Sequence, residues 1–488
     1  MLSKFALLET PDGTDPVRQY RRCRARTLPD EGRLGGKTLE QYVCDCLSRQ
    51  ALFTLPERIK FFKHLRTLSG EALTPAERVA LIDDTMARFA EPRLSMTLDD
   101  TGNRPMHFAL TEEQLAIQET ALAFAKERLV PKAGEWDETC HFPVDVIRAT
   151  AALGMATIYV PAEQGGSGLS RLDGALIMEA LSYGCPAIAA YISIHNMVAW
   201  MTAKYGTPAQ VADWMPKLGS MEWLASYCLT EPGAGSDAVA LKTRARKDGD
   251  QYVLDGTKQF ISGAGATDFY FVFARTGSEG ADGVSAFVVM KDTPGLTFGP
   301  NERKMGWNAQ PTRQVIMDNC RVPAANLVGG IEGRGFRFAM SGLDGGRINI
   351  GACSLGPAAA ALDKARAYLF ERKAFGKNLA EFQVLQFKIA DMATNLEAAR
   401  LMIYRAADAL DRADPQASMY SAMAKRFATD LGIEIVDEAL QIHGGYGYLK
   451  DYGLEKMVRD LRVHQILEGT NEIMRVVISR KLLGGNRG

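Results

Sequence analysis

Glu468 is a single carboxylate between an apolar tripeptide and a Gly-Thr-Asn turn, in the segment HQILEGTNEIMR. An acid just before a helix can simply stabilise the helix dipole. Mostly apolar neighbours would instead raise the proton affinity of a desolvated carboxylate, which suits a general base that removes a proton from a weakly acidic C–H group. Gly469 allows a sharp turn that would point the carboxylate into a cleft. By themselves, these residues leave both interpretations open.

The segment YCLTEPGAGSDA begins at Tyr227 and follows a strand-like run. It contains the pattern G-x-G-x-x-A from Gly233, but a Rossmann dinucleotide site requires a helix directly afterwards. The chain continues instead with VALKTRARKDGDQYVLDG, which alternates in polarity and turns twice at Asp-Gly. This context favours a β-meander and argues against a Rossmann site. A plain turn remains possible, as does a loop whose N–H groups and the hydroxyls of Thr230 and Ser236 hold an anion or a flavin.

Two more glycine pairs stand out. In QIHGGYGY, the pair Gly444 and Gly445 exceeds the single glycine that a helix C-cap needs, and glycines let a backbone approach a ligand closely. In LDGGRINI, Gly345 and Gly346 fall inside a predicted helix, where each costs about 1 kcal/mol relative to alanine. That second pair indicates either tight packing or room kept for a ligand.

The overall composition excludes several classes of protein. The 488 residues carry 57 basic and 58 acidic side chains, so no global field favours nucleic acid or an anionic membrane. No uninterrupted apolar run is long enough for a membrane span. The first residues, MLSKFALLETPDGTDP, lack a long apolar stretch and contain acids, so we expect no targeting segment. A bacterial cytoplasmic location is the expectation, or the mitochondrial matrix if the source is a eukaryote.

The eight cysteines are spread through the chain, which argues against a disulfide framework and for a reducing compartment. Only Cys44 and Cys46 are close together, and no His or Cys pair nearby completes a zinc site. The sequence also lacks the HExxH pattern of zinc proteases. We therefore expect no bound metal.

Hydrophobic patterns divide the chain into four predicted domains. They are a helical extension at 1–104, an α-domain at 105–225, an antiparallel β-domain at 226–332 and a helical bundle at 333–488. The β-domain is predicted from short runs of β-branched and aromatic residues, separated by glycine turns. In the extension, TPAERVALIDDTMARF at 74–89 has the capping signals of a helix.

Two further helices have clear signals. One is predicted to begin at a Thr111 cap, with acids in its first turn. The other presents an apolar seam that steps by three and four residues, as in a helix bundle. The residues of the seam are Leu385, Ile389, Met392, Leu396, Ala399, Met402 and Ala406.

In order along the chain, PAEQGGSGLS, YCLTEPGAGSD, KQFISG, ERKAFG, QIHGGYGY and ILEGTNEIMR resemble the motifs of the acyl-CoA dehydrogenase family. The resemblance extends from Phe108 to Leu483. It implies an α+β fold with an N-terminal helical domain, a middle antiparallel β-domain and a C-terminal four-helix bundle, with FAD and an acyl-CoA thioester between them. Residues 1–104 have no counterpart in the family. They could be an accessory domain, an interaction arm, or an extension ahead of a start at Met96.

The resemblance also implies groups of ligand-binding residues. One group would line FAD: Tyr227, Cys228, Leu229, Thr230, Glu231, Pro232, Gly233, Ala234, Gly235, Ser236, Phe260, Ile261 and Ser262. A second would reach the FAD of a neighbouring subunit in a homotetramer: Arg372, Phe382, Gln383, Gln441, Ile442, His443, Gly444 and Gly445. Thr470, Asn471 and Glu472 would touch the cofactor beside Glu468. The acyl-CoA would lie near Ser236, Asp344, Gly345, Gly346, Arg347 and Arg480.

Glu468 falls on the family's usual catalytic base. In a minority of members the base comes from the residue before the motif arginine, which here is Gly346 and has no carboxylate. The implied reaction is α,β-dehydrogenation, in which Glu468 removes the α-proton of the thioester and a β-hydride passes to FAD. The Glu468 N–H would help to stabilise the developing enolate, and electron-transfer flavoprotein would take up the electrons.

The segments around Gly345 and Glu468 are most similar to those of family members that convert isobutyryl-CoA to methacrylyl-CoA in valine breakdown. A pocket discriminates one methylene by only about 1–3 kcal/mol, so overlap with short straight-chain or 2-methylbutyryl substrates is expected. Two other kinds of protein would share most of these motifs. One is an acyl-CoA oxidase that uses O2, and the other is a non-catalytic scaffold that binds acyl-CoA or flavin.

Overall fold

The computed structural model describes residues 33–34, 37–38 and 109–484. The chain divides into two compact units, Met1–Ile117 and Gln118–Gly488. In the first unit, strands β1 (Arg33–Leu34) and β2 (Lys37–Thr38) form an antiparallel pair. The predicted helix at 74–89, the Cys44 and Cys46 pair and the alternative start at Met96 lie outside the described residues.

Helices occupy most of the chain from residue 112 to residue 219. They are α5 (Glu112–Phe124), α6 (Ala133–Thr139), α7 (Val144–Ala149), α8 (Arg171–Gly184), α9 (Pro186–Tyr205) and α10 (Pro208–Gly219). The predicted Thr111 cap is confirmed, because its Oγ1 accepts a hydrogen bond of 3.2 Å from the Gln114 N–H. Ser170 begins α8 in the same way, accepting from the Asp173 N–H at 3.1 Å.

A seven-stranded sheet follows the helices. Its strands are β3 (Ala225–Cys228), β4 (Arg244–Asp248), β5 (Gln251–Ser262), β6 (Phe269–Arg275), β7 (Val284–Met290), β8 (Leu296–Phe298) and β9 (Thr312–Pro323). The order is β3-β6-β4-β5-β9-β8, and β7 pairs with β6. Most pairs are antiparallel, as predicted. However, β3 and β4 each pair in parallel with β6, which the pattern of short strands did not indicate.

Strand β6 is buried on both faces. Phe269, Phe271 and Phe273 pack with residues of the helices. Tyr270 and Val272, on the other face, pack with residues of β5, β7 and β9. Alternate residues of a strand point to opposite faces, so this continuous apolar run serves two cores at once. The sheet is therefore fixed to the helical part of the second unit and can hold loops in a defined position beside it.

The glycine-rich segment after β3 leads into the β4–β5 hairpin. No helix of the kind that a Rossmann site needs begins within it, since only a three-residue 3-10 turn at Ala238–Ala240 separates it from β4. The prediction that this glycine-rich segment is not a Rossmann site, made from the sequence, is confirmed.

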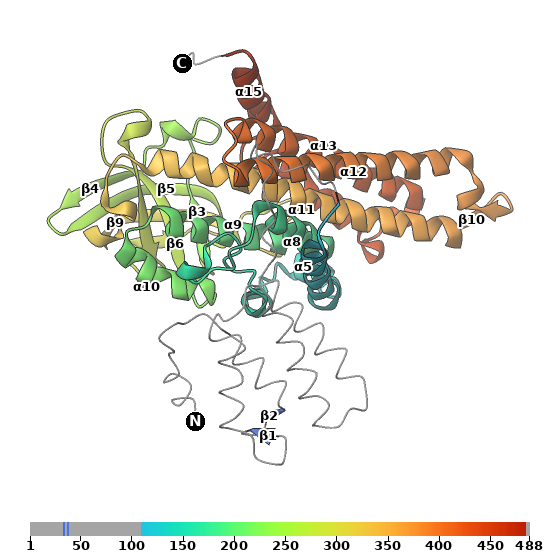
Figure 1. Ribbon diagram of the computed structural model, residues 1–488, viewed down its shortest axis with the longest axis horizontal. Helices are drawn as coiled ribbons and strands as arrows, with labels where there is room; N and C mark the ends of the chain where they lie inside the picture. Colours follow the sequence, from blue (N-terminus) through green and yellow to red (C-terminus); the bar gives the residue numbers. More distant parts are fainter. Residues whose placement is uncertain (1–32, 35–36, 39–108, 485–488) are drawn as a thin grey trace, which may run out of the picture. The chain divides into compact units, whose positions relative to one another are not determined.

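The C-terminal part is a helical bundle. It comprises α11 (Gly335–Glu371), α12 (Gln383–Asp411), α13 (Ala417–His443), α14 (Leu454–Arg462) and α15 (Asn471–Leu482), with a hairpin of β10 (Lys373–Ala374) and β11 (Lys377–Asn378) after α11. The long helix α11 runs from beside the sheet to the end of the bundle that carries β10 (Figure 1). None of the described helices combines the length and apolar content that a membrane crossing requires.

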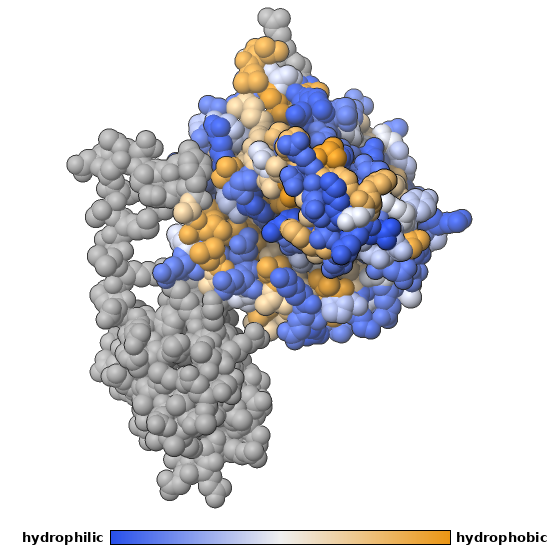
Figure 2. Space-filling model, turned by 90° about the vertical axis from the view of Figure 1, so that its right-hand side faces the viewer, coloured by the Kyte–Doolittle hydropathy of each residue, from blue (hydrophilic) through white to orange (hydrophobic). Residues whose placement is uncertain are grey.

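The predicted seam of α12 is buried over only part of its length. Met392, Leu396, Ala399 and Ala406 are buried, but Met402 and, nearer the helix start, Leu385 and Ile389 are half-exposed. Exposed apolar side chains gather in the segments around that start, namely Phe370, Phe375, Val384, Phe387, Tyr448 and Leu449. Figure 2 views the second unit from the β10 side, where hydrophobic residues interrupt the polar surface.

Candidate active site

Glu468 lies in a strained turn between a 3-10 helix at Val463–Gln465 and the start of α15. Its backbone φ is +53° and that of Gly469 is +92°. A left-handed conformation costs a non-glycine residue on the order of 1 kcal/mol, so surrounding contacts must hold the turn. Thr470 then caps α15, accepting a hydrogen bond of 3.3 Å from the Ile473 N–H.

The carboxylate of Glu468 points at helix α11. The residue is half-buried, but its Oε2 oxygen is buried and has no hydrogen-bond partner among the described residues. A Cβ atom at Gly346 would lie 2.1 Å from that oxygen, and one at Gly345 would lie 2.4 Å from Nη1 of Arg171. The first alternative raised for this glycine pair is confirmed, because side chains of the protein itself pack closely against both glycines. That the pair keeps room for a ligand stays a prediction.

The surroundings raise the pKa of Glu468. Burial raises it from 4.5 to about 7, while the positive charges of Arg347 and Lys425 act in the opposite direction. The Arg347 Nη1 donates to Asp344 Oδ1 at 2.8 Å, and its Nε lies 3.4 Å from the Glu468 carbonyl oxygen. A carboxyl group that titrates near neutrality, with an unpartnered oxygen, can accept a proton from a bound molecule.

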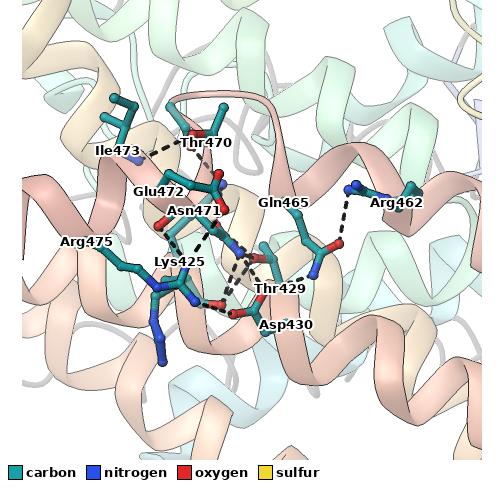
Figure 3. Close-up of polar contacts among 12 residues, drawn as sticks. Lys425, Thr429, Asp430, Arg462, Gln465, Thr470, Asn471, Glu472, Ile473 and Arg475 are labelled. Atoms are coloured by element: carbon teal, nitrogen blue, oxygen red, sulfur yellow. Dashed lines mark hydrogen bonds and ion pairs between the residues drawn. The ribbon is translucent and has the colours of Figure 1, made fainter. Parts of the chain in front are cut away.

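Lys425 of α13 holds the far side of the turn (Figure 3). Its Nζ donates to the Gly469 carbonyl oxygen and to Asn471 Oδ1, each at 2.9 Å. The Asn471 amide in turn donates to Thr429 Oγ1 at 2.9 Å and to Asp430 Oδ1 at 2.7 Å. The side chain of Asn471 is thus committed to the protein interior, and its carbonyl oxygen accepts from Arg475 Nη1 at 3.1 Å, so its backbone N–H is the group left to touch a cofactor.

His464 anchors the near side of the turn. The Trp307 Nε1–H donates to His464 Nε2 at 3.2 Å, and His464 Nδ1 lies 2.7 Å from Ser354 Oγ. Because an indole N–H can only donate, Nε2 is the acceptor and Nδ1 carries the proton. Burial lowers the pKa of His464 to about 3, so this ring is neutral and links the β-domain loop to the segment before Glu468.

The glycine-rich loop after β3 is held from behind by a buried ion pair. Lys258 Nζ lies 2.8 Å from Glu231 Oε1, and the Glu231 carboxylate also accepts from the N–H groups of Lys242 and Thr243, at 2.6 and 2.9 Å. The Glu231 side chain therefore faces the interior. The opposite side of the loop is exposed, at Pro232, Gly233, Gly235 and Ser236.

Phe260 lies beside this loop on a β-bulge. The register of β5 against β9 shifts between Lys258 and Ile261, and the Gln259 N–H donates to the Thr230 carbonyl oxygen at 2.8 Å. Phe260 has φ +58° and is 63% exposed, as expected where a bulge turns a side chain out of the sheet. An exposed aromatic ring beside a loop with exposed glycines fits a flat ring system that carries phosphates.

Several other residues predicted to line FAD point inward. Their side chains are buried in the protein, so only their backbone atoms could reach a cofactor: Cys228, Leu229, Ala234 and Ile261. Tyr227 is half-buried. Its pKa is raised well above 10, mainly by burial and to a smaller extent by the negative charge of Glu468. Ser262 is half-buried, and its carbonyl oxygen accepts from Ser226 Oγ at 2.7 Å.

The residues predicted to reach the FAD of a neighbouring subunit lie away from Glu468. A cavity of about 360 Å³ at the end of α11 is lined by Arg372, Ile442, His443, Gly444 and Gly445, among other residues. At 1.5 Å per residue, the end of α11 is roughly 38 Å along the helix from Gly346. This group and Glu468 therefore cannot serve the same reacting centre within one chain. Of the remaining members, Phe382 is half-buried, whereas Gln383 and Gln441 are exposed.

The predicted substrate residues are only partly brought together. Asp344 is bound by Arg347 and by Ser418, so its carboxylate already has partners. Ser236 lies on the exposed side of the glycine-rich loop, and Arg480 is exposed on α15. Glu472, predicted to touch the cofactor, is exposed at the start of α15.

Sequence reasoning missed Arg171 and Lys425. The buried guanidinium of Arg171 lies 4.0 Å from the centre of the Tyr159 ring and 4.7 Å from that of Trp200. Lys425 could have been found from the sequence. It lies three residues after Ala422 and four before Thr429, a spacing that places it on the buried face of α13, where a lysine is unusual. Nothing in the local sequence marks Arg171. Residues 109–484 contain no cluster of His, Cys, Asp or Glu suited to a metal ion.

Comparison with known proteins identifies the family. Models of the acyl-CoA dehydrogenase N-terminal, middle and C-terminal domains match residues 111–222, 226–320 and 333–483. The chain is 55% identical to "Isobutyryl-CoA dehydrogenase, mitochondrial" of Dictyostelium discoideum, over 76% of this chain and 90% of that protein. It is 53% identical to the protein of the same name from Bos taurus, over 77% and 90%.

A solved structure is also similar. A chain described as "Electron transferring flavoprotein of Acidaminococcus fermentans" has a TM-score of 0.76 and 41% identity, covering 78% of this chain and 100% of that chain. The fold predicted from the sequence, with helical, β and helical parts, is confirmed. Family members depend on FAD, and the outward Phe260 and glycine-rich loop fit that cofactor. The chain belongs to the acyl-CoA dehydrogenase family of FAD-dependent oxidoreductases.

Proposed function

We propose that this protein oxidises isobutyryl-CoA to methacrylyl-CoA in valine catabolism, with Glu468 as the catalytic base. One observation carries the proposal: the buried Oε2 of Glu468 has no hydrogen-bond partner among the described residues, in a packed interior where Gly346 makes room for the carboxylate. The substrate is supported by the two relatives named isobutyryl-CoA dehydrogenase.

In the proposed reaction, Glu468 removes the α-proton of the thioester. A pKa of about 7 leaves a useful fraction of the carboxylate ionised at neutral pH, and it makes that carboxylate more basic than an exposed glutamate. The N–H of Glu468, held in the strained turn, is suited to donate to the thioester oxygen as negative charge develops there. When FAD is bound, it accepts the β-hydride and with it the electron pair.

The chain's own residues would hold the cofactor in two places. The exposed side of the glycine-rich loop, with Phe260 to Ser262 beside it, would bind one FAD. The cavity around Arg372 and Gly444 would contact the FAD of a neighbouring subunit. Two features support a homotetramer. This cavity is too far from Glu468 to serve the same active site within one chain, and the apolar residues Val384 and Phe387 near it are exposed.

The acyl pocket is proposed to suit a short, branched chain. Gly345 and Gly346 give space to Arg171 and Glu468, so the region beside the reacting carbons is bounded by side chains that arrive from other elements. Activity on 2-methylbutyryl- or butyryl-CoA would follow from the modest energy of one methylene, about 1–3 kcal/mol. The electrons would pass to electron-transfer flavoprotein, in the mitochondrial matrix if the source is a eukaryote and in the cytoplasm if it is a bacterium.

An anaerobic flavin-bleaching screen tests this function. Purified FAD-loaded protein is mixed with isobutyryl-, 2-methylbutyryl-, butyryl-, isovaleryl- and longer acyl-CoA, and absorbance of the oxidised flavin is followed. Isobutyryl-CoA is expected to bleach the flavin fastest. Preference for another chain would replace the substrate, and no bleaching by any chain would favour a non-catalytic scaffold.

An oxygen electrode separates the dehydrogenase from an oxidase. With isobutyryl-CoA and air but no other acceptor, we expect slow oxygen uptake, and addition of electron-transfer flavoprotein should accelerate turnover. Rapid formation of peroxide without the flavoprotein would overturn the assignment of the electron acceptor.

A further inference from the structure

Lys425 is a fully buried lysine in the middle of α13. Its hydrogen bonds go to two neutral acceptors, the Gly469 carbonyl oxygen and Asn471 Oδ1, each at 2.9 Å. Within residues 109–484, Lys425 forms no ion pair with a carboxylate. A buried ammonium without a paired anion is costly, so its retention at this point requires an explanation.

The position of the ammonium is fixed by a second layer of contacts. Asn471, which accepts from Lys425, is itself held by hydrogen bonds to Thr429 and Asp430 on the next turns of α13 (Figure 3). The same helix thus supplies both the ammonium and the groups that hold its acceptor. A flexible lysine chain is thereby confined to one place.

The other acceptor belongs to the strained turn. Gly469 directly follows Glu468, and both residues have positive φ. A hydrogen bond to the carbonyl oxygen of Gly469 opposes rotation of the peptide that directly follows the two positive-φ residues, and so helps to fix their conformation. Lys425 is therefore placed to hold the turn in the orientation that presents Oε2.

We infer that Lys425 is a positioning residue for Glu468, which both locks the turn at Gly469 and places a fixed positive charge beside that turn. The inference rests on the proposed role of Glu468 as the base. It assigns to Lys425 a double effect: the carboxylate is held in place, and its ionised form is stabilised where burial alone would favour the protonated form.

The charges around the two groups agree with this role. Burial lowers the pKa of Lys425 to about 8, against the attraction of Glu468, so the lysine is charged at neutral pH. The other groups that act on it are Arg347 from α11, Asp430 from its own helix and Glu472 from α15.

Around Glu468, Arg347 is the other cation. The groups affected by its negative charge are Tyr227 of β3 and Cys353 of α11. Neither Tyr227 nor Cys353 is ionised near neutral pH, because burial raises the pKa of each. Arg347 and Lys425 therefore set the electrostatic environment of the base, and only Lys425 also holds the residue that follows it.

The test measures the titration of Glu468 without relying on turnover. The carboxyl C=O stretch of Glu468 is isolated as the infrared difference between FAD-loaded protein and its Glu468→Gln variant, as a function of pH. The same measurement is made in Lys425→Met, and in Lys425→Arg, which keeps the charge. Lys388→Met is the control, because Lys388 pairs with Glu438 away from the turn.

We expect the titration midpoint of Glu468 to rise by about one pH unit in Lys425→Met, because a positive charge that lowers the pKa of Glu468 has been removed. Lys425→Arg and the Lys388 control should keep the wild-type midpoint. In turnover assays, the acid limb of kcat/KM should move with the midpoint, and kcat should fall at least tenfold at its plateau as the turn loosens.

Each outcome is decisive for Lys425. An unchanged midpoint in folded, FAD-loaded Lys425→Met would overturn the inference. If that variant does not fold, Lys425→Gln, which keeps a donor toward Gly469 but no charge, carries the same test. Should the wild-type protein not oxidise isobutyryl-CoA while the midpoint still shifts, the proposed function fails and the link between Lys425 and Glu468 stands.

Discussion

Gly346 and Glu468 share one small space: a Cβ atom on the glycine would lie 2.1 Å from the carboxylate oxygen Oε2. Such a contact cannot be relieved without moving the carboxylate or the helix. Gly346→Ala should therefore displace the carboxylate, and we expect kcat/KM to fall on the order of a hundredfold, as misplaced catalytic groups do.

The neighbouring glycine supplies the control for that substitution. Gly345→Ala meets Nη1 of Arg171 at 2.4 Å and does not meet the Glu468 carboxylate. We expect Gly345→Ala to reduce kcat/KM far less than Gly346→Ala, with both variants retaining FAD. Equal losses in the two variants would mean that helix packing, and not the carboxylate, is what alanine disturbs.

The raised pKa of Glu468 sets the pH dependence of activity. Removal of the α-proton needs the ionised carboxylate, so kcat/KM should rise with pH through about 7 and level off above it. A profile that is flat between pH 5.5 and 8.5, with proton removal shown to be rate-limiting by an α-deuterium isotope effect, would argue for a base of ordinary pKa.

The same shift affects stability. The pKa of Glu468 is raised from 4.5 to about 7 in the folded protein, so its stabilising contribution is complete below pH 4.5 and is lost as pH rises through 7. Glu468→Gln should consequently unfold at a higher temperature than the wild type at pH 8, by an amount equivalent to about 1–2 kcal/mol after allowance for partial exposure. Near pH 4.5 the difference should be smaller, and calorimetry at the two pH values checks it.

The buried pair of Lys258 and Glu231 should support the glycine-rich loop. Lys258→Met leaves a buried carboxylate without its cation, which typically costs about 3–5 kcal/mol, and we expect faster loss of FAD on dilution. Burial tends to raise the pKa of Glu231, but Lys258 and the N–H donors lower it below 4.5. The ionised Glu231 carboxylate therefore contributes to the stability of the folded protein above pH 4.5, and this contribution is lost as the pH falls below that value. If packing alone matters at this position, replacing Lys258 by Met and Glu231 by Leu in one variant should restore stability.

The exposed start of α12 is expected to be covered by a second copy of the chain. Val384 is 63% and Phe387 58% exposed there, and a double Val384→Asp, Phe387→Asp variant should shift the sedimentation of the protein from a tetramer toward smaller species. Ile331→Asp, an exposed apolar residue in the β-domain loop, is the matched control and should leave the tetramer intact. A wild-type protein that sediments as a monomer would remove this part of the proposal.

The sequence was most informative where a motif and its local structure are the same thing. The Thr111 cap, the exclusion of a Rossmann site after Tyr227 and the helix–β–helix order needed only neighbouring residues. In contrast, the parallel pairing of β3 with β6 joins Ala225 to Phe269 across more than forty residues, and short-range patterns contain no signal for it.

The site was predictable in part for the same reason. The turn at Gly469 and the unusual glycines of α11 could be read locally, but their relationship could not. Only the fold brings Gly346 to Glu468 and Lys425 to Gly469, because these residues lie on elements far apart in the chain. The inward direction of Glu231 and Asn471 likewise depends on partners, Lys258 and Asp430, that no local pattern identifies.

The most direct measurement is anaerobic mixing of isobutyryl-CoA with FAD-loaded wild-type protein and with Glu468→Gln. The glutamine keeps the shape of the side chain but cannot accept the α-proton. We expect the wild type to bleach its flavin rapidly, and the variant to bind the thioester, with a perturbed flavin spectrum, but to bleach at least a thousandfold more slowly, near the upper part of the range for general-base catalysis, about 10²–10⁴. Bleaching of Glu468→Gln at the wild-type rate would show that another group removes the proton and would contradict the account.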